Sequence, residues 1–248
     1  MKLPLYKHTL IFIPLLIFYA LSSSLSFANK LNIVVGLDRP PYVLQQSNSG
    51  YELELLSQVV KLMGYQANYI YAPYGRTQKF LSEPDIDGIT TMTSDTESKV
   101  ERLTDTYVTY QNSVVSLAES ELKINKISDL ENVGVISFHN AKSLLGKEYY
   151  DAVKNNPDYM EIAKQLTQVT LFLRERVHCI VIDKNIFNYI IKPLAINKAV
   201  VFHDLFPPTD YQMAFKDPLL VASFNKQLAL FKETQDYQQL KQKYLTPF

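Results

Sequence analysis

The chain has 248 residues, and its 25 Lys and Arg balance 25 Asp and Glu, so its formal net charge is zero. This balance offers no basic surface to attract nucleic acid or an anionic membrane, and we expect no nucleic-acid partner. Cys179 is the only cysteine, so an intramolecular disulfide is excluded and the fold must rely on its core. A 47% hydrophobic composition can supply that core, either as one large domain or as two lobes.

Residues 1–28 have the features of a secretory signal peptide. Lys2 and Lys7 form a basic start, residues 10–21 are uncharged, and residues 26–28 place small side chains at the −3 and −1 positions. A membrane-spanning helix needs about 20 apolar residues, so we favour cleavage after this segment over a membrane anchor. The mature chain would then have 220 residues and 23 basic against 25 acidic side chains, a net charge of −2.

The first part of the mature chain is predicted to alternate between strands and helices. Residues 31–37 read as a buried strand that ends before Pro40 and Pro41, because consecutive prolines cannot continue a ladder. After residues 50–52, apolar side chains recur at helical spacing as far as Gly64. We then expect a strand at 68–72, a short helix at 73–81 and a strand at 86–90.

The second part continues this alternation after an extended stretch, 108–118, whose middle is too polar for a core strand. The pattern predicts an α/β fold with largely parallel sheets, in two sheet-and-helix sets divided near residue 113. Ligands of open α/β sheets bind beyond the carboxyl ends of strands, so the segments that follow strands are the candidate sites. The further elements expected are a strand at 132–137, a helix from about 140, a helix at 170–176, a strand at 177–182, a helix at 184–191 and two C-terminal helices that separate near 233–234.

Six segments of the chain occur in the order and spacing of a known family: GLDRPPY, GYELELL, DGITTMTSDTESKVERLTDTY, DLENVGVIS, RERVHCIVID and FNKQLALFKETQDYQQLKQKYL. Over essentially its whole mature length the chain resembles the periplasmic solute-binding proteins of family 3, of the polar-amino-acid type. The resemblance implies a two-lobed α/β fold, periplasmic-binding-protein-like type II. Each lobe would be a central sheet flanked by helices, joined to the other by two crossing strands.

The resemblance further implies that the first lobe contains both ends of the mature chain, 29–112 and 207–248, with the second lobe, 113–206, between them. The crossings are expected near 109–117 and 211–215. Members close on a small ligand by hinge motion. We expect a periplasmic monomer that binds a small molecule without a cofactor, with an ABC-transporter permease or a membrane sensor as the open classes of partner.

Asp183 ends a predicted strand and begins a helix, and two roles remain open for it. Its carboxylate is a good N-cap for the helix that follows, worth about 1 kcal/mol. The resemblance implies instead that it accepts the ligand's α-ammonium group. The two roles are compatible.

The hydroxyl-rich segment that begins after residue 89 is a second candidate site. Thr90, Thr91 and Thr93 can offer hydroxyls to a ligand or cap the segment that follows. The resemblance implies an arginine in this loop that clamps the ligand's carboxylate. One count along the sequence places Lys99 at that position and another places Glu97, and a lysine cannot replace the bidentate guanidinium fork.

Arg76, within the segment PYGR, is the candidate to replace the missing arginine, and a solvated surface arginine is the equally open alternative. Asp38 and Tyr42 follow the first strand, and the resemblance implies that Tyr42 stacks on the ligand. At Asn140 the family usually has small residues, whereas this chain reads Phe-His-Asn at 138–140. The helix amides there can still receive an anion, although the bulkier side chains narrow that side.

Two other functions compete with the non-enzymatic solute-binding function that we favour. The same fold hosts dehydratase-like enzymes, for which Glu97 with His139 is the best acid–base pair that the sequence offers. The third alternative is a degenerate binder that acts through protein contacts, since the departures at 138–140 and at Lys99 both argue against a standard amino-acid pocket. His178 and Cys179 lie on opposite faces of a strand without further ligands, so no metal site is expected.

Overall fold

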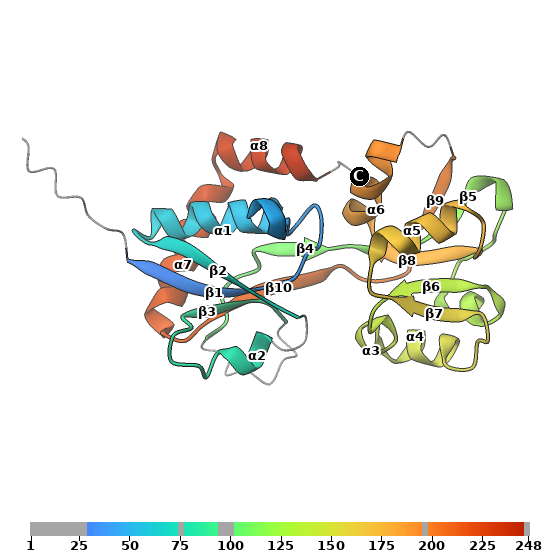
Figure 1. Cartoon of the computed structure of the whole chain (residues 1–248), viewed down its shortest axis with the longest axis horizontal. Coiled ribbons are helices and arrows are strands. Elements are labelled where there is room, and N and C mark those ends of the chain that lie inside the picture. Colours follow the sequence, from blue (N-terminus) through green and yellow to red (C-terminus); the bar gives the residue numbers. More distant parts are fainter. Residues whose placement is uncertain (1–28, 74–76, 94–101, 195–197, 246–248) are drawn as a thin grey trace, which may run out of the picture.

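The computed structural model describes residues 29–73, 77–93, 102–194 and 198–245. They form two five-stranded mixed sheets, each flanked by helices, and these two halves lie side by side (Figure 1). This is the predicted two-lobed α/β fold. The predicted signal peptide (1–28), Arg76, Glu97 and Lys99 lie outside the described residues.

The first lobe is built on a sheet of order β2-β1-β3-β10-β4, in which β2, β1 and β3 are parallel and β10 runs antiparallel to β3 and β4. Alternation along β1 fixes the two faces: Ile33 and Val35 pack with α1 and α7, whereas Val34 packs on the side of α2. Its elements are β1 (Lys30–Gly36), α1 (Tyr51–Leu62), β2 (Gln66–Ala72), α2 (Thr77–Phe80), β3 (Gly88–Met92), β4 (Val108–Tyr110), β10 (Thr209–Phe215), α7 (Pro218–Lys232) and α8 (Gln235–Tyr244).

The second lobe is built on a sheet of order β7-β6-β8-β5-β9. Cys179 and Val181 of β8 are fully buried and pack on the side of α4, and Ile180 and Ile182 pack against α5 and α6. The elements are β5 (Asn112–Leu117), β6 (Val135–Phe138), α3 (Ala141–Leu144), α4 (Gly146–Val153), β7 (Tyr159–Ile162), α5 (Gln165–Leu173), β8 (Cys179–Asp183), α6 (Lys184–Ile191) and β9 (Val200–His203).

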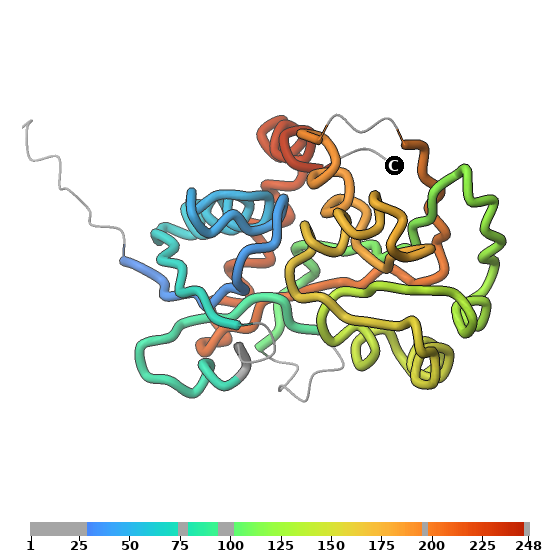
Figure 2. The backbone as a smooth tube through the Cα atoms, turned by 45° about the vertical axis from the view of Figure 1, so that its right-hand side comes forward, coloured from blue at the N-terminus to red at the C-terminus, as the bar shows by residue number. Residues whose placement is uncertain are grey.

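The chain passes between the sheets twice (Figure 2). It leaves the first sheet after Tyr110 and enters the second at Asn112, inside the predicted crossing. The prediction of a return at 211–215 is wrong, because these residues belong to β10, whose Tyr211 pairs with Val108. The return runs instead between β9 and β10, through residues 204–208, where two prolines lack the N–H donors that a ladder needs.

Two further expectations are corrected. The sheets are mixed rather than largely parallel, because β10 and β5 each run antiparallel to both neighbours. The segment judged too polar for a core strand contains β5, which lies between β8 and β9 with almost every residue buried. Ser113 donates to Asp204 at 2.7 Å and Ser116 lies 2.9 Å from the His203 ring nitrogen. Each buried hydroxyl has a partner, which removes most of the cost of its burial.

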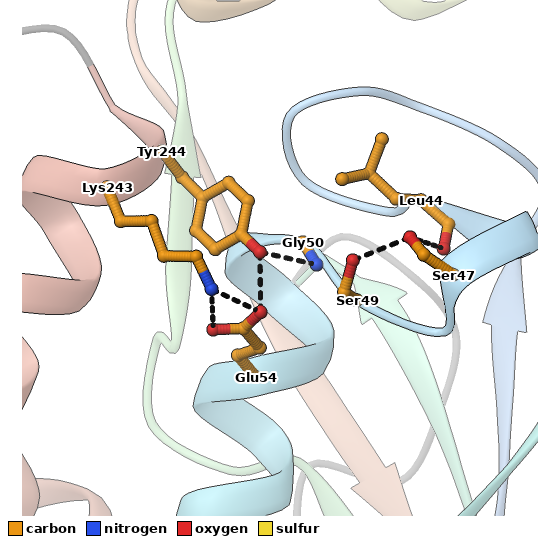
Figure 3. Close-up of polar contacts among 7 residues, drawn as sticks. All are labelled: Leu44, Ser47, Ser49, Gly50, Glu54, Lys243 and Tyr244. Carbon is orange, nitrogen blue, oxygen red and sulfur yellow. Dashed lines mark hydrogen bonds and ion pairs between the residues drawn. The ribbon is translucent and has the colours of Figure 1, made fainter.

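The C-terminal helix α8 is hydrogen-bonded to the start of α1 (Figure 3). Lys243 Nζ lies 2.8 and 2.9 Å from the two carboxylate oxygens of Glu54. The Tyr244 hydroxyl donates to the same carboxylate and accepts the Gly50 N–H at 3.3 Å. These contacts bind the end of the chain to the loop that precedes α1. In the described chain, no helix combines the length and apolar character required to span a bilayer.

Substitution of Gly50 tests how tightly the loop before α1 is packed. Its φ is 112°, and a Cβ added there would lie 2.5 Å from the carbonyl oxygen of Tyr42. We expect Gly50→Ala to lower the free energy of unfolding by roughly 3 kcal/mol in urea titrations. Gly64→Ala is the matched control, since its φ is 87° but no atom lies within 4 Å of the added Cβ. It should cost about 1 kcal/mol, and equal losses for the two variants would contradict this packing.

Candidate functional site

The carboxyl ends of β1, β3 and β8 approach the junction of the two sheets. Tyr42 follows β1 and Asp183 ends β8, and the structure brings them together: the Tyr42 hydroxyl donates to Asp183 Oδ1 at 3.1 Å. This contact joins residues 141 positions apart in the sequence. The candidate site therefore contains a direct buried hydrogen bond from the first lobe to the second.

Asp183 is almost completely buried, with 1% of its surface exposed. It is the N-cap of α6, accepting the Ile186 N–H at 3.0 Å, so the first of its two predicted roles is confirmed. Its second oxygen accepts the Gln111 N–H, at 2.9 Å, from the crossing between the sheets. Burial raises the pKa of Asp183 to about 6, although the backbone donors from Ile186 and Gln111 act in the opposite direction.

Tyr42 is fully buried rather than facing solvent. Its ring stacks on Tyr110 with centroids 4.1 Å apart, and its hydroxyl accepts the Asn185 side-chain amide at 2.9 Å. Burial, followed by the Asp183 charge, raises the pKa of this phenol, so it stays a proton donor at neutral pH. In this conformation the ring that we expected to stack on the ligand instead makes an internal contact between the lobes.

A second buried carboxylate, Glu52, lies in the first turn of α1 with 1% exposure. Tyr107 donates to one of its oxygens at 2.9 Å, and Tyr110 donates to the other. Arg39 donates to the Tyr110 hydroxyl at 3.2 Å, with its guanidinium carbon 5.4 Å from the centre of that ring. Phenol donors and a nearby cation are what a buried carboxylate requires.

This cluster leads to the predicted hydroxyl-rich segment, because the backbone N–H of Thr91 donates to the Tyr107 hydroxyl at 3.2 Å. Thr91 has a φ of 55°, which is unusual for a β-branched residue. Within the described residues, three buried polar atoms near this strand end have no hydrogen-bond partner: Thr90 Oγ1, Thr91 Oγ1 and Gln212 Oε1. Gln212 pairs with Met92 across the two strands, so these atoms come from adjacent strands of one sheet.

In the second lobe, Asn140 is exposed at the start of α3. Its N–H donates to Glu161 at 2.7 Å and the N–H of Lys142 donates to the same carboxylate at 2.9 Å. Burial raises the pKa of Glu161, but the donors from Lys142, Tyr159 and Asn140 outweigh it and lower the pKa. The amides that we expected to receive a ligand's anion therefore already hold a carboxylate of the chain.

The sequence also singled out Asp38, Thr93 and His139. Asp38 is exposed, and its carboxylate accepts the Gln45 N–H at 2.6 Å within its own loop. Thr93 follows the end of β3. His139 is exposed, and its proposed partner Glu97, like Arg76 and Lys99, lies outside the described residues. Across the part of the chain that the structure describes, no group of three or more His, Cys, Asp or Glu side chains could hold a metal ion.

Sequence reasoning did not single out Glu52, Tyr107, Tyr110, Arg39 or Gln212 as site residues. Glu52 carried a usable signal, because it lies three, four and seven positions before buried apolar residues of α1 and so falls on the same helix face as Leu55, Leu56 and Val59. The tyrosines carried none, since 17 are spread along the chain. Only the return of β10 into the first sheet brings Gln212 beside β3.

The fold and the junction between its lobes define a periplasmic-binding-protein-like protein of type II. The chain matches the bacterial extracellular solute-binding proteins, family 3, over residues 31–247. It therefore belongs to that family, and membership supports a solute-binding function outside the cytoplasmic membrane. A search of curated proteins finds no match.

Solved structures with this fold share little sequence with the chain. An ancestral arginine-binding protein bound to arginine is 16% identical, with a TM-score of 0.69, and covers 89% of this chain and 100% of its own. A histidine kinase sensor domain similar to periplasmic binding proteins is 18% identical, with a TM-score of 0.69, and the match covers 88% of this chain and 97% of that domain. An ancestral amino-acid-binding protein, a precursor of cyclohexadienyl dehydratase, is 21% identical, with a TM-score of 0.66, and the match covers 88% of this chain and 96% of that protein. At these identities the likeness shows the fold alone.

Removal of one phenol donor tests the Glu52 cluster. Tyr107→Phe leaves a buried carboxylate oxygen without its donor, so we expect the free energy of unfolding to fall by about 2 kcal/mol. Tyr71→Phe is the control, because the Tyr71 hydroxyl bonds to Asn48 near the surface, and it should cost less than about 0.5 kcal/mol. Equal effects in urea titrations would show that Glu52 does not depend on Tyr107.

The raised pKa of Asp183 predicts a pH dependence of stability. The folded state holds this proton more tightly than the unfolded chain, whose carboxyl has the ordinary value of 3.8. The resulting stabilisation is fully present below that value and is lost as the pH rises through about 6. Asp183→Asn cannot titrate, so wild type should lose on the order of 2 kcal/mol relative to this variant between pH 4 and pH 7.5. A difference in melting temperature that is constant over this range would contradict the burial of the charge.

Proposed function

We propose that this protein is a periplasmic solute-binding protein that captures a small polar or anionic solute, similar to an amino acid, between its two lobes. Residues 29–112 with 207–248 would form one lobe and residues 113–206 the other, exported through a signal peptide cleaved after residue 28. The solute would be presented to a membrane partner, either an ABC-transporter permease or a sensor. Family membership supports the binding function in this proposal.

The observation that carries the proposal is the set of buried polar atoms at the end of β3, on Thr90, Thr91 and Gln212, that have no hydrogen-bond partner among the described residues. A buried hydroxyl or amide oxygen without a partner costs roughly 1–3 kcal/mol, so native structures rarely retain one without a reason. These atoms lie at the carboxyl end of a strand, which is where sheets of this kind bind ligands. The polar groups of a bound solute would satisfy them.

The charge of the solute needs a partner of its own in the site. In this conformation the Asp183 carboxylate is surrounded by protein donors, and the amides of Asn140 and Lys142 bond to Glu161. We propose that Arg76 or Lys99 supplies the cation for an anionic group of the solute, in place of the arginine that the family usually carries. The internal satisfaction of Asp183 and Asn140 also favours, as a second candidate, a binder that acts through protein contacts rather than through a soluble ligand.

A thermal-shift screen of residues 29–248 tests the binding function. The panel contains amino acids, small carboxylates, polyamines, sugars and short peptides. A ligand at 100 times its dissociation constant adds about 2.7 kcal/mol, which raises the melting temperature by roughly 5–10 °C at this length. We expect at least one such shift, and silence across the panel would contradict capture of a small solute and favour the protein-facing alternative.

A matched pair of variants then locates the ligand. Thr91→Val keeps the shape but removes a hydroxyl that has no partner among the described residues, so it should leave the unliganded protein as stable as wild type or more so. It should nevertheless weaken binding of the panel ligand about tenfold, the loss expected for one hydrogen bond. Thr167→Val, on the exposed surface of α5, is the control and should change neither quantity. Unchanged affinity in Thr91→Val would place the ligand elsewhere.

A further inference from the structure

The hydrogen bonds of Tyr42 connect the two lobes through side chains alone. The hydroxyl donates to Asp183 at 3.1 Å and accepts the Asn185 amide at 2.9 Å, and all three residues are at most 5% exposed. One side of the contact comes from the loop between β1 and α1, and the other from the start of α6. The contact therefore bridges the two lobes through the chain's own side chains.

The first lobe holds Tyr42 rigidly. Its backbone N–H donates to the Arg39 carbonyl at 2.8 Å, and its own carbonyl accepts the Glu52 N–H at 3.0 Å. The ring stacks on Tyr110, which Glu52 anchors in turn. Gly50 packs directly against the Tyr42 carbonyl, so the Tyr42 backbone is held to the first lobe.

Asp183 is held just as firmly on the other side. It caps α6 through Ile186 and accepts the N–H of Gln111, whose carbonyl accepts the Lys184 N–H at 3.0 Å. Gln111 lies in the crossing between β4 and β5, about which a hinge motion would take place. Asp183 thus contacts a first-lobe loop, the crossing and a second-lobe helix at once.

We propose that Tyr42, Asp183 and Asn185 form an inter-lobe latch, which holds the lobes together without a ligand and is controlled by the protonation of Asp183. The latch goes beyond the proposed function, because it closes the lobes through the chain's own side chains whatever solute is bound.

The direction of this control follows from the groups around Asp183. Tyr42 faces it from the β1–α1 loop, with Tyr110 of β4 stacked on the Tyr42 ring, and the Gln111 N–H faces it from the crossing. On α6, Lys184 pairs with Asp204 at 2.7 Å. Glu52 adds negative charge behind Tyr42. Burial favours the neutral form of Asp183 more strongly than its hydrogen-bond donors favour the ionised form. Separation of the lobes would expose it to water, which favours the ionised form. Rising pH therefore favours separation.

Double electron–electron resonance tests the latch in residues 29–248 without ligand. Spin labels on Gln58→Cys in α1 and Glu148→Cys in α4 report the separation of the lobes from two exposed positions. Cys179 is fully buried, so it offers no competing site for the label. Tyr42→Phe removes the bridging hydroxyl alone. Tyr69→Phe is the matched control, because the part-buried Tyr69 hydroxyl bonds within the first lobe, to the carbonyl of Leu53 at 2.7 Å.

At pH 5 we expect one short distance in wild type and in Tyr69→Phe, and an added population at longer distance in Tyr42→Phe. At pH 8 wild type should gain the longer population as well, whereas Asp183→Asn should keep the short distance at both pH values. Superimposable distributions for wild type and Tyr42→Phe would overturn the latch, as would equal opening in Tyr69→Phe. A wild-type distribution that does not change between pH 5 and pH 8 would overturn the control by Asp183. Since no ligand is added, these outcomes are independent of the thermal-shift screen.

Discussion

The structure depends on how it satisfies two buried carboxylates, Glu52 and Asp183, at the junction of its lobes. An isolated ionised carboxylate in a protein interior is so unfavourable that it must be paired, hydrogen-bonded or neutralised. Glu52 receives two phenol hydroxyls with Arg39 nearby, and Asp183 receives one phenol hydroxyl and two backbone amides. These donors come from separate segments of the chain, so the carboxylates fix where those segments meet.

This requirement also explains why the junction is rich in tyrosine. A tyrosine contributes a large apolar ring to the core and one donor at its tip. The ring fills space while the hydroxyl donates a hydrogen bond to a carboxylate. Tyr42 and Tyr110 stack between the two acids, and burial raises the pKa of both phenols, which keeps each of them a donor. Phenylalanine at either position would preserve the packing and leave an acid short of a partner.

Local sequence patterns predicted much of the fold. The helix at 184–191 coincides with α6, and the division of the C-terminal helices near Thr234 is confirmed, because Thr234 caps α8 by accepting the Tyr237 N–H. The sequence did not indicate the edge strands β7 and β9, nor the role of β5. Ser113 and Ser116 made β5 look too polar for a core strand. The residues that satisfy their hydroxyls, Asp204 and His203, lie about 90 residues further along the chain, so the local sequence does not show them.

The candidate site could be predicted less well than the fold. The Thr-rich end of β3 and the importance of Asp183 were visible in the sequence, since both follow apolar strand patterns. That Asp183 bonds to Tyr42, and that Glu161 already holds the amides of Asn140 and Lys142, depends on long-range contacts that no local pattern encodes. The predicted cations Arg76 and Lys99 remain proposals for the same site.

Amide hydrogen exchange with and without the panel compound that gives the largest thermal shift tests capture between the lobes most directly. It reports protection at individual segments of both lobes at once. A ligand bound at the end of β3 and enclosed by the second lobe should slow exchange at residues 90–93 and at 183–186 together. Protection confined to one lobe, or located away from both segments, would contradict capture between them.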